Sequence, residues 1–195
     1  MATFSEILAD VYTLTKRSDL VAETKLAIKS ATLKLHSRDY FPRDIYETGI
    51  VFSSADFTQT IEYSTLIPRF RQLKYIRKTD SAGELGAFLT ILTPALSLDR
   101  YNVNRDDVVY LAGSELKIRS STSLQYAILG CYLYPNLEES TYSSWIAVAQ
   151  PYLIILEAAR IVLQGIGADS TARLLESQIA EHYAILDQYI SSEGF

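Results

Sequence analysis

The sequence predicts a mainly α-helical protein, a bundle of about four helices that carries an antiparallel β insertion. Apolar residues recur at helical spacing near both ends of the chain, whereas β-branched and aromatic residues alternate with polar ones in the middle. With 195 residues, 48% of them hydrophobic, the chain can bury a core of its own. We therefore predict a single domain over 1–195, with the bundle in 1–47 and 136–195 and the β-rich insertion in 48–135.

Two helices are expected before the insertion. Thr3 and Glu6 have the spacing of a capping box, so a first helix should occupy about 4–16. A second amphipathic helix should follow over about 19–38, because its apolar residues recur at helical spacing with lysines between them. Pro42 disfavours helix in the residue before it, so the helical pair should end there.

The middle of the chain is expected to form strands. The segments "IVFSSADFTQTIEY" and "RFRQLKYIRK" alternate polar residues with β-branched and aromatic ones, as half-buried strands do. Residues 79–104 contain glycines and a proline, which favour short helical turns and loop. The strands should therefore lie between about 49 and 134.

A tight hairpin is predicted in "DDVVYLAGSELKIRSS", residues 106–121. Gly113 and Ser114 suit its two-residue turn, and that turn sets the register. The pairs expected across the strands are Leu111 with Leu116, Val109 with Ile118, Tyr110 with Lys117, and Val108 with Arg119. One face is then apolar and the other is aromatic and basic. The next run, "SLQYAILGCYLYP", should return antiparallel to the hairpin as a third strand.

Two helices are expected after the insertion, near 143–164 and 169–190. Pro151 lies inside the first of them, so it should mark a kink or the first turn of a new helix. Glycines close that helix, and the apolar spacing beyond them suits an antiparallel partner across a short loop.

The sequence contains few residues or motifs that are typical of catalytic sites. His36 and His182 have no second histidine or cysteine at the spacing of metal ligands, so packed or surface roles are expected for both. Cys131 lies in an apolar run and should be an inert core thiol. A small enzyme with a site built from Asp106, Asp107 and Glu115 would still lack a base and a nucleophile. We predict no catalytic residue, no metal site, no cofactor and no enzyme activity.

Charge and hydropathy limit the partners. Residues 1–78 hold 12 basic and 9 acidic side chains, and residues 79–195 hold 6 and 14. This asymmetry indicates either two differently solvated faces or a basic and an acidic end suited to head-to-tail contacts. The sequence contains no dense basic patch, so specific binding to duplex DNA is not expected. The most apolar stretch contains Gln150, Pro151, Glu157 and Arg160, so no membrane span is expected. With one cysteine and no secretory signal pattern, synthesis inside the cell is expected.

Several motifs resemble those of the head-to-tail adaptor proteins of tailed bacteriophages, including the tail-tubular-protein-A type. Gly113 in the hairpin, the spacing from Trp145 to Pro151, and Ala158-Ala159 before Gly167 carry the resemblance. It extends over the segments "TKLAIKSATLKLHSRDYFPRD", "VVYLAGSELKIRSS", "YAILGCYLYPNLEES" and "SSWIAVAQPYLIILEAARIVLQGIG". Residues 79–104 lie outside it.

The resemblance implies a structural virion protein at the head-tail interface, made in the cytoplasm of the bacterial host. Twelve copies would form a ring that docks on the portal protein and extends the channel through which double-stranded DNA passes during packaging and ejection. The ring would also be the platform for the next component, a tail nozzle or tail tube protein. No enzyme activity and no cofactor belong to that role.

The aromatic and basic face of the hairpin is the candidate interface. Tyr110, Lys117 and Arg119 are expected on it, and tyrosine and arginine often dominate protein contacts. The chain holds 14 tyrosines, which favours a protein that works in contact with other proteins. The alternative reading is a small intracellular module that binds proteins or assists assembly without catalysis. A solvated hairpin face remains open as a third explanation for these residues.

Overall fold

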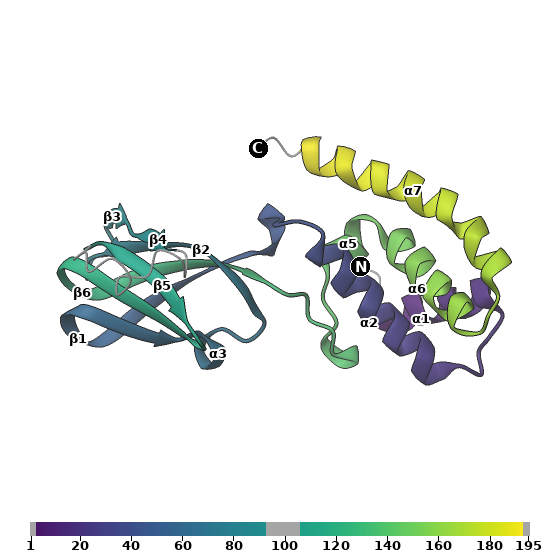
Figure 1. The fold of residues 1–195 in the computed structure, drawn as a ribbon, viewed down its shortest axis with the longest axis horizontal. Coiled ribbons are helices and arrows are strands. Elements are labelled where there is room, and N and C mark those ends of the chain that lie inside the picture. The colour runs from purple at the N-terminus through teal and green to yellow at the C-terminus, as the bar shows by residue number, and fades with distance from the viewer. Residues whose placement is uncertain (1–2, 93–105, 193–195) are drawn as a thin grey trace. The chain divides into compact units, whose positions relative to one another are not determined.

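The computed structural model describes residues 3–92 and 106–192, and the chain divides into two compact units (Figure 1). The helical unit comprises Met1–Tyr40 and Pro135–Phe195, and the β unit comprises Phe41–Tyr134. Helices make up 47% of the described residues and strands 35%, with a six-stranded mixed sheet. The protein is therefore α+β, and the prediction of a mainly α-helical bundle is wrong. The single-domain assignment stays a prediction.

The helical unit contains every helix that the sequence predicts. Its elements are α1 (Phe4–Thr15), α2 (Val21–Ser37), the short 3-10 helix η3 (Glu139–Thr141), α5 (Trp145–Ala149), α6 (Pro151–Gly165) and α7 (Asp169–Ser192). Pro151 is the first residue of α6, where a missing N–H costs nothing, so it starts a new helix after α5. Thr3 and Glu6 form the expected capping box at α1.

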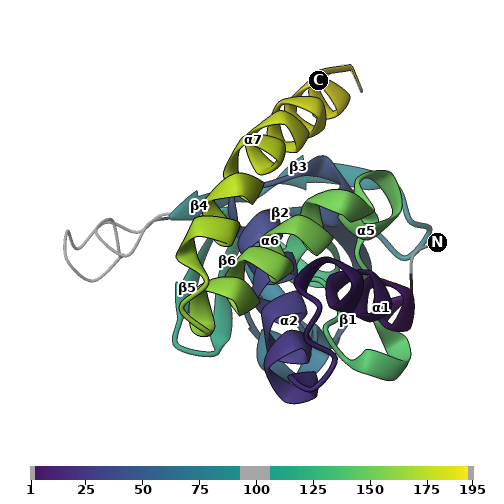
Figure 2. The same cartoon turned by 90° about the vertical axis from the view of Figure 1, so that its right-hand side faces the viewer.

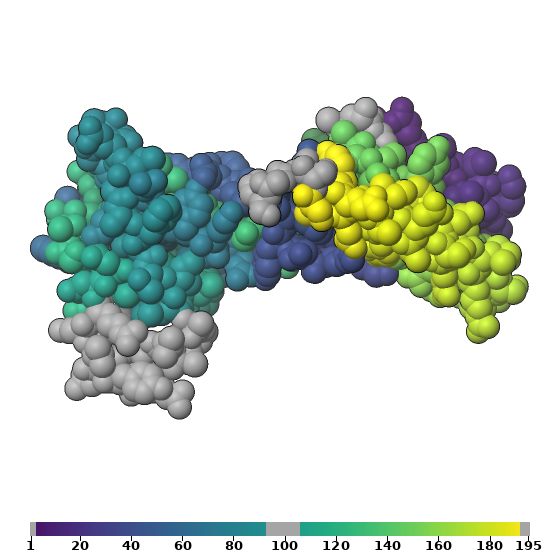
Figure 3. Space-filling view, turned by 90° about the horizontal axis from the view of Figure 1, so that it is seen from above, coloured from purple at the N-terminus to yellow at the C-terminus, as the bar shows by residue number. Residues whose placement is uncertain are grey.

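The core of the helical unit surrounds α6. This helix buries residues on nearly all sides, including Leu153, Ile154 and Ala158, each 0% exposed. Figure 2 shows α6 among α1, α2 and α7, and the buried residues of all four helices form one cluster. In contrast, α7 buries only a thin stripe and lies on the surface of the unit (Figure 3), as its yellow residues show.

In its described residues, the β unit contains six strands and two short helices. Its elements are the 3-10 helix η1 (Pro42–Asp44), β1 (Ile45–Glu62), α3 (Tyr63–Leu66), β2 (Phe70–Thr79), β3 (Leu85–Phe88), β4 (Thr90–Leu92), β5 (Val108–Ala112) and β6 (Glu115–Leu133). The sheet is mixed because β4 runs parallel to β5, whereas every other pair of strands is antiparallel.

Two long strands, β1 and β6, join all parts of the sheet. The first half of β6 lies between β1 and β5, and its second half lies between β1 and β2. The pairing of β1 with β6 shifts register between Val51 and Thr58. Such irregularities let a strand bend, so that residues from both halves, Ile50 and Ile61 among them, reach one core.

The predicted hairpin is confirmed as β5 and β6, with all four expected pairs in register. Gly113 has φ +64°, a conformation that glycine adopts without strain. Val109, Leu116 and Ile118 are buried as expected, whereas Leu111 is 39% exposed.

Two predictions for the β unit are wrong. The run "SLQYAILGCYLYP" is not a separate returning strand, because β6 continues through Ser120–Ser123 without a turn. Serine and threonine can occupy a strand, and no glycine or proline interrupts the chain there. In the region predicted as helical turns and loop, 85–88 and 90–92 are strands. The rest of that prediction, from 93 to 104, lies outside the described residues.

Candidate functional site

The structure brings Tyr110, Lys117 and Arg119 together on one face of the β5–β6 hairpin. Tyr110 is paired with Lys117, and Arg119 lies two residues further along β6. Both cations have acidic partners close by: Lys117 Nζ lies 2.6 Å from Glu115 Oε2, and Arg119 Nε donates to Asp106 Oδ1 at 3.1 Å. All three side chains are partly exposed, so the face is accessible, and its role as an interface stays a prediction.

Asp107 fixes the start of this hairpin. Its φ of +60° is uncommon for a residue other than glycine, and its carboxylate accepts bonds from the Ser121 N–H at 2.9 Å and Oγ at 2.7 Å. The same carboxylate forms an ion pair with Lys78. The bond from Lys78 and those from Ser121 hold the pKa of Asp107 far below its usual value. The ionised carboxylate therefore ties β5 to β6 and β2.

A second exposed surface crosses the sheet from β1 to β3. The Tyr75 ring on β2 extends over Gly130 of β6, and the Tyr75 hydroxyl donates a hydrogen bond to the Glu47 carboxylate on β1. Residue 130 must be glycine for this contact, because a Cβ would lie 2.5 Å from the Tyr75 ring. We call this set, together with Phe88 and Arg77, the aromatic patch.

Phe88 completes the aromatic patch at the edge of the sheet. Its ring packs edge-on against Tyr75 at 5.5 Å, and the Arg77 guanidinium lies 4.8 Å from the centre of the ring. Phe88 nevertheless remains 58% exposed. Sequence analysis missed this patch, although the alternation of Tyr75 and Arg77 along β2 was a visible signal.

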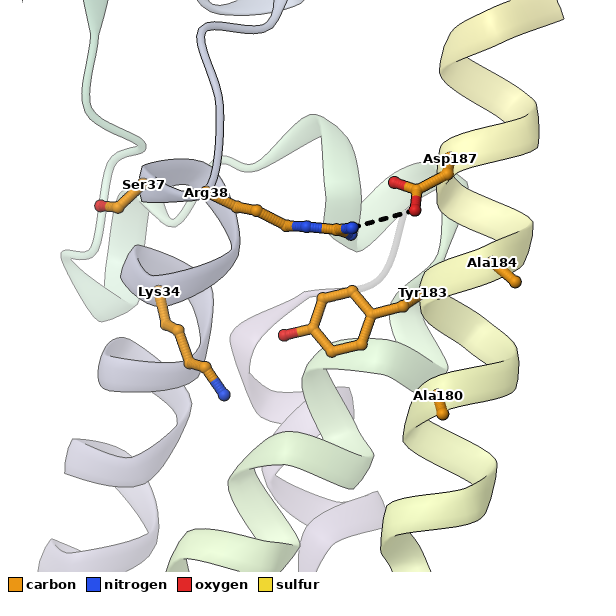
Figure 4. Close-up of a pocket in the computed structure, with 7 residues that line it drawn as sticks. All are labelled: Lys34, Ser37, Arg38, Ala180, Tyr183, Ala184 and Asp187. Atoms are coloured by element: carbon orange, nitrogen blue, oxygen red, sulfur yellow. Dashed lines mark hydrogen bonds and ion pairs between the residues drawn. The ribbon is translucent and has the colours of Figure 1, made fainter.

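The helical unit carries an open pocket between α2 and α7 (Figure 4). Its volume is about 700 Å³. Arg38 spans it, with its guanidinium 4.8 Å from the Tyr183 ring centre and 2.9 Å from Asp187 Oδ2. Ala180 and Ala184 present small apolar surfaces to the opening, and Lys34 lies on the α2 side. The pocket thus combines an apolar wall with charged groups of both signs.

A buried carboxylate lies beside this pocket. Glu157 on α6 is 1% exposed, and three side chains donate to it: Lys34 at 2.8 Å, Arg160 at 2.8 Å and Tyr183 at 2.9 Å. Burial opposes its ionisation, but these hydrogen bonds outweigh burial and lower the pKa of the carboxyl. Burial and the nearby charge of Glu157 raise the pKa of Tyr183 to about 12. The only signal for this network in the sequence was an acidic residue, Glu157, within an apolar segment.

The histidines and the cysteine take part in packing. His36 is buried, with Nε2 2.9 Å from Ser144 Oγ and its ring against Trp145. His182 stacks on Tyr152 with the ring centres 6.1 Å apart. Cys131 is fully buried, which raises the pKa of its thiol to about 11 and confirms the predicted position in the core.

Within 3–92 and 106–192, no three acidic, histidine or cysteine side chains gather in a way that could hold a metal ion. Over the same residues, no helix has the length and apolar character needed to cross a membrane. No protein-family model matches the chain, and no curated protein matches it significantly.

Proposed function

We propose that this protein is a structural head-to-tail adaptor of a tailed bacteriophage. Twelve copies would form a ring on the portal protein, extend the DNA channel, and hold the next tail component. The proposal rests on the resemblance of the helical segments and the hairpin to phage adaptors. One observation in the structure supports it above others: the sheet of the β unit presents large apolar side chains to solvent.

These exposed side chains are typical of a protein that works inside an assembly. Val51 is 69% exposed, Leu85 55% and Phe88 58%, and all three lie on strands of one sheet. Exposed apolar groups favour contact with another protein, because each contact removes them from water. A ring subunit needs such surfaces toward its neighbours as well as toward portal and tail.

The charge distribution suits a conduit for DNA. The helical unit holds 8 basic and 13 acidic residues, whereas the β unit holds 10 of each. The whole net charge of −5 thus belongs to the helical unit, and the division into basic and acidic halves of the sequence does not follow the two units. A surface with surplus acid lets a duplex slide without holding it.

The mass of the particle tests this proposal. Native mass spectrometry should show a closed ring, either for the protein alone or after addition of portal protein. A sample that stays monomeric with portal present would contradict the proposal. Tight binding to duplex DNA at physiological salt, with a steep dependence on salt, would contradict the conduit role.

The second candidate is a small intracellular protein-binding or assembly-chaperone module. The pocket between α2 and α7 favours it, because an apolar wall beside charged groups suits an amphipathic segment. The same measurement separates the two candidates. A chaperone would bind one assembly component at a fixed ratio and leave before the particle is complete, whereas an adaptor remains in the virion.

A further inference from the structure

Strand β1 has one side without a partner strand. It extends over 18 residues, and among the described residues it pairs with β6 alone. Alternate N–H and C=O groups of an extended strand point to its two sides, so about half of those in β1 point away from β6. No backbone hydrogen bond within the described part of the chain occupies them. We call this side of the strand the β1 edge.

The regular part of the β1 edge is Ile45–Val51. Its seven residues pair with β6 in unbroken register, whereas the pairing is irregular between Val51 and Thr58. Lysine, proline and bulges commonly protect an edge strand from pairing with another chain. Ile45–Glu62 contains no lysine and no proline, so β1 has only the irregular pairing beyond Val51 as protection. The regular part is therefore suited to accept a further strand.

A groove of about 530 Å³ lies where the register of β1 shifts. Its lining comes from both sides of the shift and includes the core residues Ile50, Phe52 and Ile61. Val51, which is 69% exposed, and Leu66 of α3 also line it. A strand that runs along Ile45–Val51 and past its end would thus meet an apolar opening.

The charge of β1 indicates what kind of strand fits. Ile45–Glu62 contains no basic residue and three acidic ones, Glu47, Asp56 and Glu62. Within the described residues no cation forms an ion pair with these acids, and the side chains that donate to them are hydroxyl groups. Both cations of the neighbouring β6 have acidic partners of their own, Lys117 in Glu115 and Arg119 in Asp106. The uncompensated negative charge therefore favours a strand with basic residues.

We infer that the β1 edge binds an extended segment of a different protein, in which apolar and basic residues alternate. Ile50 faces the core and Glu47 lies on the opposite face of the strand, so an added strand meets apolar groups on one face and acid on the other. Backbone hydrogen bonds along Ile45–Val51 would hold the segment. Two β1 edges would instead bring like charges together. The inference names a partner for this edge and holds with or without a ring.

A labelled peptide in which valine alternates with lysine tests this contact by fluorescence anisotropy. An acidic twin has glutamate in place of lysine. Two further versions carry N-methyl groups on every valine amide or on every lysine amide, so that each blocks one side of the added strand. Val51→Lys places a positive charge on the β1 edge, and Leu174→Lys on α7, at a position that is 72% exposed, adds the same charge elsewhere. Circular dichroism checks that both variants fold.

The expected result is binding that depends on charge and on one side of the peptide backbone. Wild type and Leu174→Lys should bind the valine–lysine peptide equally. Val51→Lys, or the acidic twin with wild type, should weaken binding at least about tenfold, since each brings like charges together at the edge. Only one methylated peptide should bind, because an added strand pairs through one side. Amide exchange in Ile45–Val51 should become slower when the peptide binds.

Four outcomes would overturn the inference. The first is no binding of the valine–lysine peptide, or equal binding of its acidic twin. The second is equal affinity of Val51→Lys and Leu174→Lys, which would place the contact elsewhere. Binding of both methylated peptides, or of neither, would show that the backbone does not pair. Dimers of wild type that protect Ile45–Val51 without peptide would assign the edge to a second copy. None of these outcomes bears on the ring, which native mass spectrometry measures separately.

Discussion

The helical unit and the β unit differ in the groups that they leave unpaired at their surfaces. In the helical unit, the buried carboxylate of Glu157 has three partners, and apolar residues from four helices close around α6. In the β unit, β1 pairs with β6 alone among the described residues, and the sheet exposes Val51, Leu85 and Phe88. The helical unit also exposes apolar side chains, Leu26 at 66% and Leu174 at 72% among them, so the two units differ in the unpaired side of β1 rather than in exposed apolar surface.

We therefore expect substitutions that affect stability and substitutions that affect assembly to lie in different parts of the protein. Substitutions in the helical core should lower the free energy of unfolding, whereas substitutions on the sheet edges should change association and leave folding intact. The four predictions below test that separation.

The largest effect should come from the centre of the helical unit. Leu153→Ala removes a side chain that is 0% exposed, and the lost burial together with the cavity should cost about 2–5 kcal/mol of unfolding free energy. Urea denaturation followed by circular dichroism measures it. The matched change Val51→Ala, on the exposed β1 edge, should cost no more than about 0.5 kcal/mol. Equal costs at the two positions would contradict the comparison.

Loss of the buried charge should have the next largest effect. Glu157→Gln keeps the shape but weakens three charge-assisted hydrogen bonds, so we expect a loss of about 2–3 kcal/mol at neutral pH. The pKa of Glu157 is lower in the fold than in the unfolded chain, so its contribution is present above pH 4.5 and is lost as pH falls through the folded pKa. The difference between wild type and variant should therefore shrink in acid, and a difference that grew there would contradict this account.

A smaller effect should follow from filling the space at Gly130. Gly130→Ala pushes the Tyr75 ring away from Glu47 and should cost about 1–2 kcal/mol. In a Tyr75→Ala background the same change should cost much less, since no ring is left to collide with the new methyl group. A double-mutant cycle measures this coupling, and additive costs would show that Gly130 is needed for another reason.

The smallest effect on stability should come from the hairpin face. Tyr110→Ala with Arg119→Glu removes one partly exposed ion pair and should lower stability by no more than about 1 kcal/mol. If the face is an interface, the loss of binding should be about 2 kcal/mol or more per contact and should abolish incorporation into capsids. Assembly equal to wild type would leave the solvated face as the explanation.

The sequence predicted correctly those features that depend on residues close together in the chain. The Gly113-Ser114 turn sets the register of its hairpin, and a period of two assigns each neighbour to a face, so the pairs were predictable. Helices with strong apolar stripes were predictable for the same reason. In contrast, β3 and β4 are short and lie near two glycines, so they gave no alternating signal.

Contacts between distant segments could not be predicted. Glu157 meets Lys34 only because α2 and α6 pack side by side, and no spacing in the sequence encodes that. Tyr75 reaches Glu47 only because β6 places Gly130 between their strands. The three proposed interface residues were brought together as expected because they share one hairpin, but the acids beside two of them were not anticipated.

The connections to the β unit have a consequence for how such a protein can evolve. Ile45, near the start of the unit, is paired with Tyr132, near its end, so the chain enters and leaves through adjacent strands. An insert whose ends are neighbours can be exchanged, lengthened or removed while the host helices keep their connection. Related proteins could thus retain one helical scaffold and acquire new binding specificity by replacing this single cassette.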